Sequence, residues 1–543
     1  MKTLVRPFIC SEGGMPMSFK SRFSSPKIRL IAITTSALLA IASFAVPNAA
    51  QAASVFKVAT SAAVTTWDPV QSFSTEAFYM TNIYEPLLWK NPDGVSPEYA
   101  PALATSWSSS TNGKTWTFKL RAGATFHDGS AVTSAAVKAS LESSKKIGGA
   151  GFIWDALKTI DTPSDDTVVL NLSYAAPMDL IASSTYGAYI VNPKSLDAVA
   201  KDSKYYESGK DGGSGPYTIS SYKAGSSVVL SAYAKHWATT KPAYSTIDIS
   251  IVADGITAQQ MMTSGQVDWA TNIPLTSMTS FKRNNKYSVI KYKSPFNYVG
   301  YFNTLRAPLN NPKVRQALSL ALNYREITAV GGQGYATQAR SAVPAGIYPY
   351  DPATPQYQMA RTKAKQLLAS AGVKDLTIKI TYASENSAEA RFVPLIKDAF
   401  EAIGVKAEVQ GILFNQQWAA AKKDPANAQD LFIVKYWPTY SDAGVDNLWS
   451  LFHSSTKPFF NLSYWKNTAY DKLIDEATEL SGSDKAAAQK LYSQAMVILY
   501  NEAPGLYLYD EAQVSVVPKK FDIPKYNINY PFSAFFAGVK LSS

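Results

Sequence analysis

The most constraining feature of this chain is a hairpin followed by a turn and a helix, between Ala100 and Glu142. Asn112-Gly113 is a strong hairpin signal, because this pair readily adopts the positive φ angles of a tight turn. Apolar residues alternate with polar ones on the strand that follows: Trp116, Phe118 and Leu120. Asp128-Gly129 then turns the chain into a helix that carries Val137 and Leu141. The pattern predicts a hairpin that buries one face against a helix.

Strand and helix signals alternate along the rest of the chain. Isoleucines at every second position predict a half-buried strand: Ile247, Ile249 and Ile251. Asn311 and Pro312 fit the N-cap and the first residue of a helix. Predicted helices at 361–371 and 388–403 flank a predicted strand at 376–380. Strand after helix after strand predicts an α/β lobe with a largely parallel sheet.

The first 52 residues have the composition of a secretory signal. Lys20, Arg22, Lys27 and Arg29 precede an apolar stretch from 30 to 45, and Ala50-Gln51-Ala52 supplies an A-x-A cleavage site. We expect a signal peptide over residues 1–52. The region before the basic residues is longer than export needs, so the true start is expected at Met15 or Met17.

The remaining 491 residues are too many for one ordinary hydrophobic core, so they are expected to form two lobes. They hold 46 basic and 40 acidic residues, a dispersed charge of +6 that gives no indication of nucleic-acid binding. The only cysteine, Cys10, lies upstream of the cleavage site. The mature chain is therefore expected to lack disulfides, cysteine metal sites and a lipidated N-terminal cysteine.

Short motifs resemble one known family in their order along the chain. They run from Trp67-Asp68-Pro69 to the segment Ala503–Tyr509, and the longest is Thr117–Ser130, TFKLRAGATFHDGS. Four further motifs lie between them: Tyr84-Glu85-Pro86-Leu87-Leu88, Gly213-Ser214-Gly215-Pro216-Tyr217, Gly265-Gln266-Val267-Asp268 and Val314-Arg315-Gln316-Ala317-Leu318. The chain resembles the peptide/nickel-type extracellular solute-binding proteins, family 5, which deliver solutes to ABC importers.

This resemblance implies an α/β fold, a two-lobed periplasmic-binding-protein clamp with a hinge and an extra subdomain on the first lobe. The expected divisions are 53–92, 205–302 and 508–543 for the core of lobe I, 93–204 for its extra subdomain, and 303–507 for lobe II. The hinge is expected near Phe302, Asn303 and Tyr507. The resemblance further implies a monomer outside the cytoplasm that passes its solute to membrane permease subunits, with no cofactor.

The resemblance also places a ligand between the lobes. The expected ligand-binding residues are Thr66, Trp67, Trp418, Trp437, Tyr440, Asp442 and Tyr509. Peptide-binding relatives carry an aspartate a few residues after the tryptophan, where it pairs with the α-ammonium group of the peptide. Tyr440 aligns with that aspartate here, and a shift of the alignment would restore Asp442 to the role. The solute is thus expected to be oligopeptide-like or another small polar organic compound.

Two other classes of function compete with solute capture. A secreted α/β hydrolase would use carboxylate pairs such as Asp165 with Asp166, yet the chain has no G-x-S-x-G or H-E-x-x-H motif. Within the family, a sugar carrier or a metal-chelate carrier is the alternative. His127, His236 and His453 are far apart in sequence and lack metal-ligand spacing, and His127 is expected to be structural.

Overall fold

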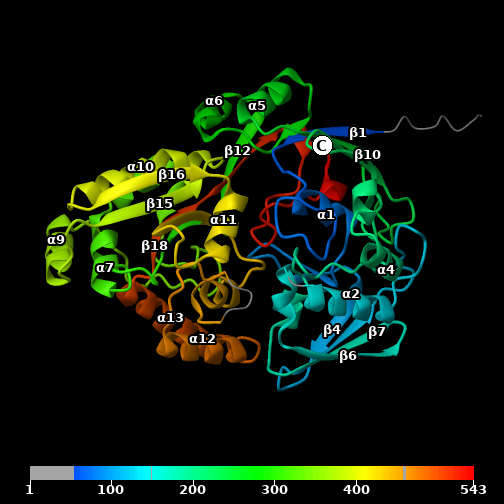
Figure 1. The fold of residues 1–543 in the computed structure, drawn as a ribbon. Coiled ribbons are helices and arrows are strands. Elements are labelled where there is room, and N and C mark those ends of the chain that lie inside the picture. The colour runs from blue at the N-terminus through cyan, green and yellow to red at the C-terminus, as the bar shows by residue number, and fades with distance from the viewer. Residues whose placement is uncertain (1–53, 148, 456–459) are drawn as a thin grey trace, which may run out of the picture. The chain divides into compact units, whose positions relative to one another are not determined.

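The computed structural model describes residues 54–147, 149–455 and 460–543, so the expected signal peptide and its alternative starts lie outside the described residues. Residues 52–543 form a single compact unit. In the described part of this unit, no helix is long and apolar enough to span a membrane. Figure 1 shows the arrangement of its sheets and helices.

The first lobe is built on a five-stranded sheet. Its strands follow in the order β11 (Trp269–Ala270), β1 (Val55–Thr60), β10 (Thr246–Ile251), β9 (Ser227–Ala232) and β8 (Tyr217–Lys223). β1 pairs in parallel with β10 and β11, and the other pairs are antiparallel. Ile247 and Ile249 are wholly buried, which confirms the predicted strand. The helices of this region are α1 (Ala77–Ile83), α5 (Gly255–Ser264) and α6 (Met278–Arg283).

A smaller sheet is inserted into the first lobe and is wholly antiparallel. It consists of β4 (Ala104–Ser109), β5 (Thr115–Leu120), β7 (Thr167–Leu172) and β6 (Leu157–Ser164). The predicted hairpin is confirmed, since β4 pairs with β5 and Gly113 has a φ of 66° in the turn. Phe118 packs with Val137 and Leu141 of α2 (Ser134–Ile147) in one core. Nearby are α3 (Met178–Ile181), α4 (Pro193–Lys201) and the pair β2 (Leu88–Lys90) and β3 (Tyr99–Pro101).

A six-stranded sheet forms the second lobe. The order is β14 (Ala336–Gln338), β18 (Gly505–Glu511), β13 (Asn297–Phe302), β17 (Leu431–Tyr436), β15 (Thr377–Ala383) and β16 (Lys406–Ile412). Only the β15 pairings with β16 and β17 are parallel. β13 is antiparallel to both neighbours, and β14 is antiparallel to β18. The prediction of a largely parallel sheet is therefore wrong, because β13 and β14 run opposite to the other four strands.

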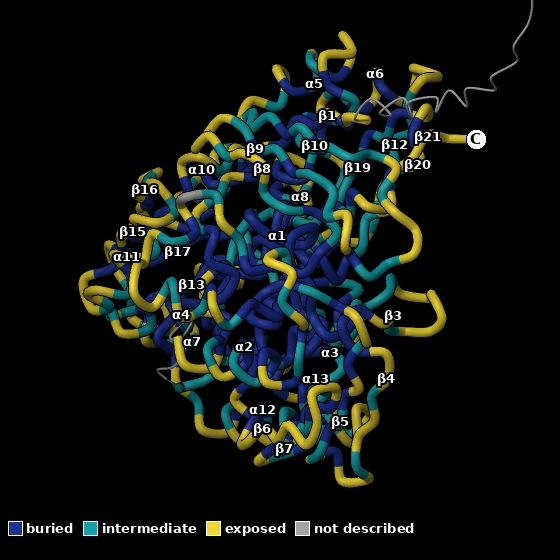
Figure 2. Tube along the Cα trace, turned by 90° about the vertical axis from the view of Figure 1, so that its right-hand side faces the viewer, coloured by how far each residue is buried: buried dark blue, intermediate teal, exposed yellow. Residues whose placement is uncertain are grey.

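Helices cover both faces of the six-stranded sheet. One face packs against α7 (Pro312–Ala321), α8 (Tyr324–Gly332), α9 (Arg361–Ser370) and α10 (Ser387–Glu401). The other packs against α11 (Phe414–Lys423), α12 (Thr468–Leu480) and α13 (Lys485–Glu502). Burial on both faces explains the nearly continuous apolar sequence of β17, Leu431-Phe432-Ile433-Val434. In Figure 2 the buried residues are dark blue, and the yellow exposed residues gather along the loops.

Two antiparallel strands connect the lobes. β12 (Tyr287–Tyr292) leads from the first lobe toward β13, and β19 (Gln513–Pro518) returns from β18. They pair along their whole length, from Tyr287 opposite Pro518 to Tyr292 opposite Gln513. After β19 the chain ends beside the first lobe with the short pair β20 (Phe521–Asp522) and β21 (Lys540–Leu541).

The crossing strands do not coincide with the hinge that the sequence suggested. Phe302 ends β13 and Tyr507 lies within β18, and each of these strands is paired on both sides. Asn303 is buried and donates a hydrogen bond to the carbonyl oxygen of Pro425, 2.8 Å away. A strand held on both edges is a poor hinge, whereas β12 and β19 pair only with each other where the chain crosses between the lobes. The position of the hinge stays a prediction. Correspondingly, residues 297–302 and 505–507 lie in the same sheet, whereas the predicted lobe boundaries separate them.

Candidate functional site

A cavity of about 660 Å³ lies beside the crossing strands. Its wall includes Thr60–Ala62 at the end of β1, and Trp269–Asn272 in β11 and just after it, both from the first lobe. Phe296 and Lys435 contribute from the second lobe, and residues 521–536 close the remaining side. The cavity therefore draws on both lobes and on the strands that connect them. Its size is typical of a small-molecule site.

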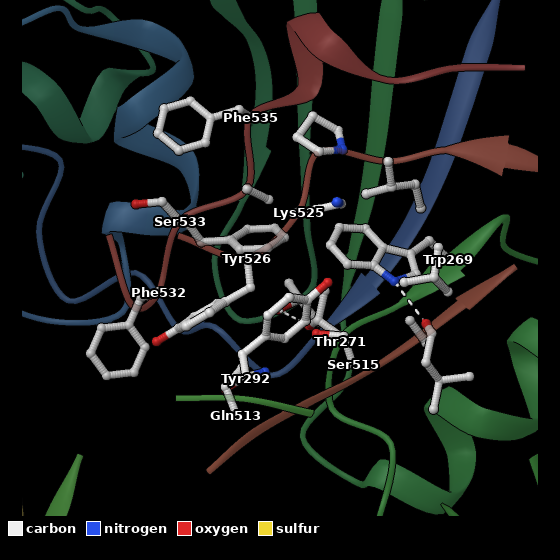
Figure 3. Close-up of a pocket in the computed structure, with 18 of the residues that line it drawn as sticks. Trp269, Thr271, Tyr292, Gln513, Ser515, Lys525, Tyr526, Phe532, Ser533 and Phe535 are labelled. Carbon is white, nitrogen blue, oxygen red and sulfur yellow. Dashed lines mark hydrogen bonds between the residues drawn. The ribbon is translucent and has the colours of Figure 1, made fainter. Parts of the chain in front are cut away.

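Aromatic rings form much of the wall, as the close-up in Figure 3 shows. Tyr292 of β12 faces Tyr526 with ring centroids 5.6 Å apart. Phe532 contacts Phe296 at 5.1 Å, and Trp269 lies on the opposite side. The indole N–H of Trp269 is already used, because it donates to the carbonyl oxygen of Val516 at 3.2 Å. Such rings offer flat apolar contact surface to a bound compound.

Trp437 adjoins this cavity immediately after β17. Its ring lies 5.0 Å from Phe532 and 6.3 Å from Phe296, both of which line the cavity. Behind it are Phe73 and Tyr186 of the first lobe, in the same apolar cluster. The half-buried Trp437 therefore contacts residues of both lobes at the edge of the cavity.

Charged groups at the cavity are mainly cationic. The ammonium group of Lys435 pairs with the carboxylate of Glu511 and lies 4.2 Å from the centre of the Phe296 ring. Lys519 and Lys525 also line the cavity. The one lining carboxylate among the described residues, Asp522, pairs with Lys540 at 3.5 Å. The wall thus presents more positive than negative charge to a solute.

A family model decides the identity of the chain. The model for the bacterial extracellular solute-binding proteins, family 5, matches residues 98–459. The chain belongs to this family. The role of a family 5 protein is solute binding, and the cavity shared by the two lobes suits that role.

Known relatives agree with this assignment. The probable D,D-dipeptide-binding periplasmic protein DdpA of Escherichia coli K12 is 27% identical over 487 residues, which cover 88% of this chain and 92% of DdpA. DppA of Helicobacter pylori, solved in complex with the peptide STSA, has a TM-score of 0.78 at 20% identity, covering 90% of this chain and 98% of that one. AgaA of A. tumefaciens R10, solved with agropinic acid, has a TM-score of 0.78 at 23% identity, covering 90% and 99%. These structures show the two-lobed fold.

Tyr440 and Asp442 follow Trp437 in this family 5 chain but do not line the cavity. Tyr440 is 5% exposed and packs in the core of the inserted subdomain. Asp442 is 2% exposed and accepts a hydrogen bond from the backbone N–H of Gly444 at 2.8 Å. Burial raises the pKa of Asp442 to about 6. In this structure neither side chain faces the cavity. The amine-anchoring role of Asp442 and the ligand-binding role of Tyr440 therefore stay predictions.

A second acidic residue of this segment, Asp446, has hydrogen-bond partners on both carboxylate oxygens. Its carboxylate accepts hydrogen bonds from the hydroxyl groups of Tyr436 and Ser450, and from the backbone N–H of Thr439. Burial raises the pKa of Asp446 above its ordinary value. Asp446 therefore fixes the loop that carries Trp437 rather than facing a solute.

The other predicted ligand residues are dispersed. Trp67 is buried against Tyr79 and Tyr222 in the core of the first lobe, and Thr66 accepts the backbone N–H of Asp68 beside it. Trp418 on α11 contacts Phe460 at 5.7 Å, which in turn contacts Phe73 of the first lobe at 6.0 Å. Trp418 thus lies near the junction of the lobes, away from the cavity.

Tyr509 is the prediction that the structure disfavours most. It is wholly buried in the core of the six-stranded sheet and stacks on Tyr298 at a centroid distance of 4.5 Å. Gly331 of α8 packs so closely that a Cβ atom there would lie 2.6 Å from the Tyr509 hydroxyl. This environment is one of packing, because a solute would have to displace a helix to reach the ring.

Sequence reasoning missed most of the cavity wall. Phe296, Lys435, Tyr526 and Phe532 come from segments that the family motifs do not mark. The aromatic spacing in Tyr526-Asn527-Ile528-Asn529-Tyr530-Pro531-Phe532 is the one local signal that could have suggested a site, but periodicity alone cannot separate a cavity wall from a core.

The histidines occupy structural positions. His127 contacts Asp211 through Nδ1 at 2.5 Å and the carbonyl oxygen of Gly215 through Nε2 at 3.0 Å, which confirms its structural assignment. His236 contacts Glu85 at 3.1 Å. In the described ranges no three His, Cys, Asp or Glu side chains gather as metal ligands would.

Proposed function

We propose that this chain captures a small polar organic solute in the cavity beside β12 and β19 and presents it to an ABC importer. The observation that carries the proposal is the composition of the cavity wall, which draws on both lobes and both crossing strands. A solute that contacts all of these elements binds the closed arrangement of the lobes better than an open one. Binding then shifts the population toward the closed form.

The sequence features complete the proposal. Residues 1–52 would direct export and be removed, leaving a diffusible protein without a lipid anchor. The relatives named above include proteins described as periplasmic, which supports a location outside the cytoplasm. The closed form would be recognised by permease subunits at the membrane, with the carrier acting as a monomer and performing no catalysis. A peptide-like solute is the starting hypothesis, because DdpA is described as a probable dipeptide-binding protein and DppA was solved in complex with a peptide.

Lobe closure gives a direct test. Residues 53–543 contain no cysteine, so two cysteines introduced into this mature chain carry the spin labels. One label goes to Ala224, in the turn between β8 and β9, and the other to Ala369 on α9, both exposed. We expect protein that retains its solute to show a narrower distance distribution between these labels than protein stripped by unfolding and refolding.

A second labelled pair controls for local effects. Ala369 and Ala419, on α9 and α11, both belong to the second lobe, and their separation should not respond to stripping. An unchanged distribution for the pair that spans the lobes would contradict the closure mechanism.

A further inference from the structure

The free charges and hydrogen-bonding groups of the cavity indicate the kind of solute it takes. We propose that the solute is an organic acid, recognised through its anionic group by cations of the cavity wall, and that it needs no free α-ammonium group. This inference rests on the proposed function and names the substrate class for that same site.

The free cations provide the first argument. Lys525 and Lys519 line the cavity and form no hydrogen bond, ion pair or ring contact with another described side chain. Figure 3 shows Lys525 among the rings of Tyr526 and Trp269. Asp522, by contrast, already has Lys540, and Glu511 beside the cavity already has Lys435. An anionic group can therefore pair with a free cation, whereas a cationic group would have to displace an existing partner.

An unused hydrogen-bond donor provides the second argument. The hydroxyl group of Tyr526, which lines the cavity, is buried and has no hydrogen-bond partner. A buried donor without a partner is costly, and a carboxylate or carbonyl oxygen of a solute would satisfy it. Asn272 adds an unpartnered carbonyl oxygen at the wall, which suits a hydroxyl or amide N–H of the same solute.

The third argument is the state of the carboxylates near Trp437. Tyr440 stands where the amine-binding aspartate is expected, and its ring is enclosed by the subdomain core. Asp442 and Asp446 are both buried, and each accepts hydrogen bonds from its own loop. An α-ammonium group would thus find no free carboxylate on this segment. The observations together favour a solute that is acidic at one end and neutral elsewhere.

Matched acids and amides test the inference. Binding would be measured by titration calorimetry on protein stripped of its solute. The probes are a dozen dipeptides of varied side chains, each with a free or acetylated amine and with a free or amidated carboxyl group, together with gluconate and gluconamide. We expect acids to bind about tenfold or more tightly than their amides, because the amide loses a charge-assisted hydrogen bond. Acetylation of the amine should change affinity less than threefold.

Variants identify the cation that acts. Lys525→Met should reduce the affinity of the acids about tenfold and leave that of the amides unchanged. Lys435→Met makes the same comparison of acids with amides for the lysine that pairs with Glu511. Lys490→Met is the control. This lysine is exposed on α13, and its replacement removes the same net charge far from the cavity wall. An equal loss in the Lys490 variant would assign the effect to net charge and overturn the inference.

The outcomes separate the inference from the proposed function. If probes with a free amine bind more tightly than acetylated probes, and amides bind as tightly as acids, the inference is overturned. Solute capture would still stand. A preference for acids that survives the combined replacement of Lys519, Lys525 and Lys435 by methionine would also overturn the inference. If no probe binds and no compound can be recovered from the purified protein, the proposed function fails and the inference fails with it.

Discussion

Replacing Arg315 by methionine should lower the free energy of unfolding by about 3–5 kcal/mol. Arg315 on α7 is 1% exposed, and its guanidinium group donates to the carbonyl oxygens of Glu502, Ala503 and Leu309. Two of these carbonyls end α13, where a helix has acceptors without partners and a partial negative charge. Burial lowers the pKa of Arg315 to about 10, so the group stays charged at neutral pH. Methionine fills similar space but leaves three buried carbonyl oxygens without a donor.

Equilibrium unfolding in urea, followed by circular dichroism, measures this loss. Arg306→Met is the matched control, because the side chain of Arg306 is 40% exposed and donates to a single carbonyl oxygen, that of Ala428, besides contacting Asp430 at 3.2 Å. The control should lose less than about 1.5 kcal/mol. Equal losses in the two variants would show that the buried carbonyl contacts of Arg315 contribute little.

Replacing Trp437 by alanine should weaken solute binding by roughly 10- to 100-fold with little loss of stability. The ring is half-buried at the edge of the cavity, where it contacts and orders Phe532 and Phe296 of the wall. Loss of such an aromatic surface at a binding site costs about 1.5–3 kcal/mol. Calorimetric titration of the variant with the solute recovered from the wild type measures the change.

Trp107→Ala is the control for that experiment. Trp107 is also half-buried and contacts one ring, Tyr99 at 6.4 Å, but it lies in the inserted subdomain. Its replacement should leave affinity unchanged. Unfolding of the Trp437 variant, rather than weaker binding, would place Trp437 in the core. Replacement of Tyr440, which is buried in the subdomain core, is by contrast expected to lower stability.

Local signals predicted the elements well. Asn311 caps α7 with Pro312 in the first turn, as the sequence indicated. These features depend on a few adjacent residues, since caps and turns satisfy backbone groups locally. The predicted helices at 361–371 and 388–403 correspond to α9 and α10 within two residues.

Features that depend on distant pairing were predicted less well. The direction of β13 and β18 follows from pairing between segments some 200 residues apart, which no local pattern encodes. The same limitation applies to the hinge, which the sequence predicts at Phe302 and Tyr507, inside paired strands, and not at the crossing strands β12 and β19. The cavity wall has a similar origin, because Phe296 and Phe532 meet only after the chain has crossed between the lobes twice. Motifs in this chain mark packing and turns, whereas most of the residues that line the cavity lie between the motifs.

Native mass spectrometry of the purified protein tests the central claim, that this chain holds a small solute in its cavity, most directly. We predict a complex heavier than the free chain by the mass of one small organic compound, which is released on denaturation and rebinds the stripped protein at one site. A protein that carries no such compound, and that binds none from an extract of the cells that produce it, would contradict the account.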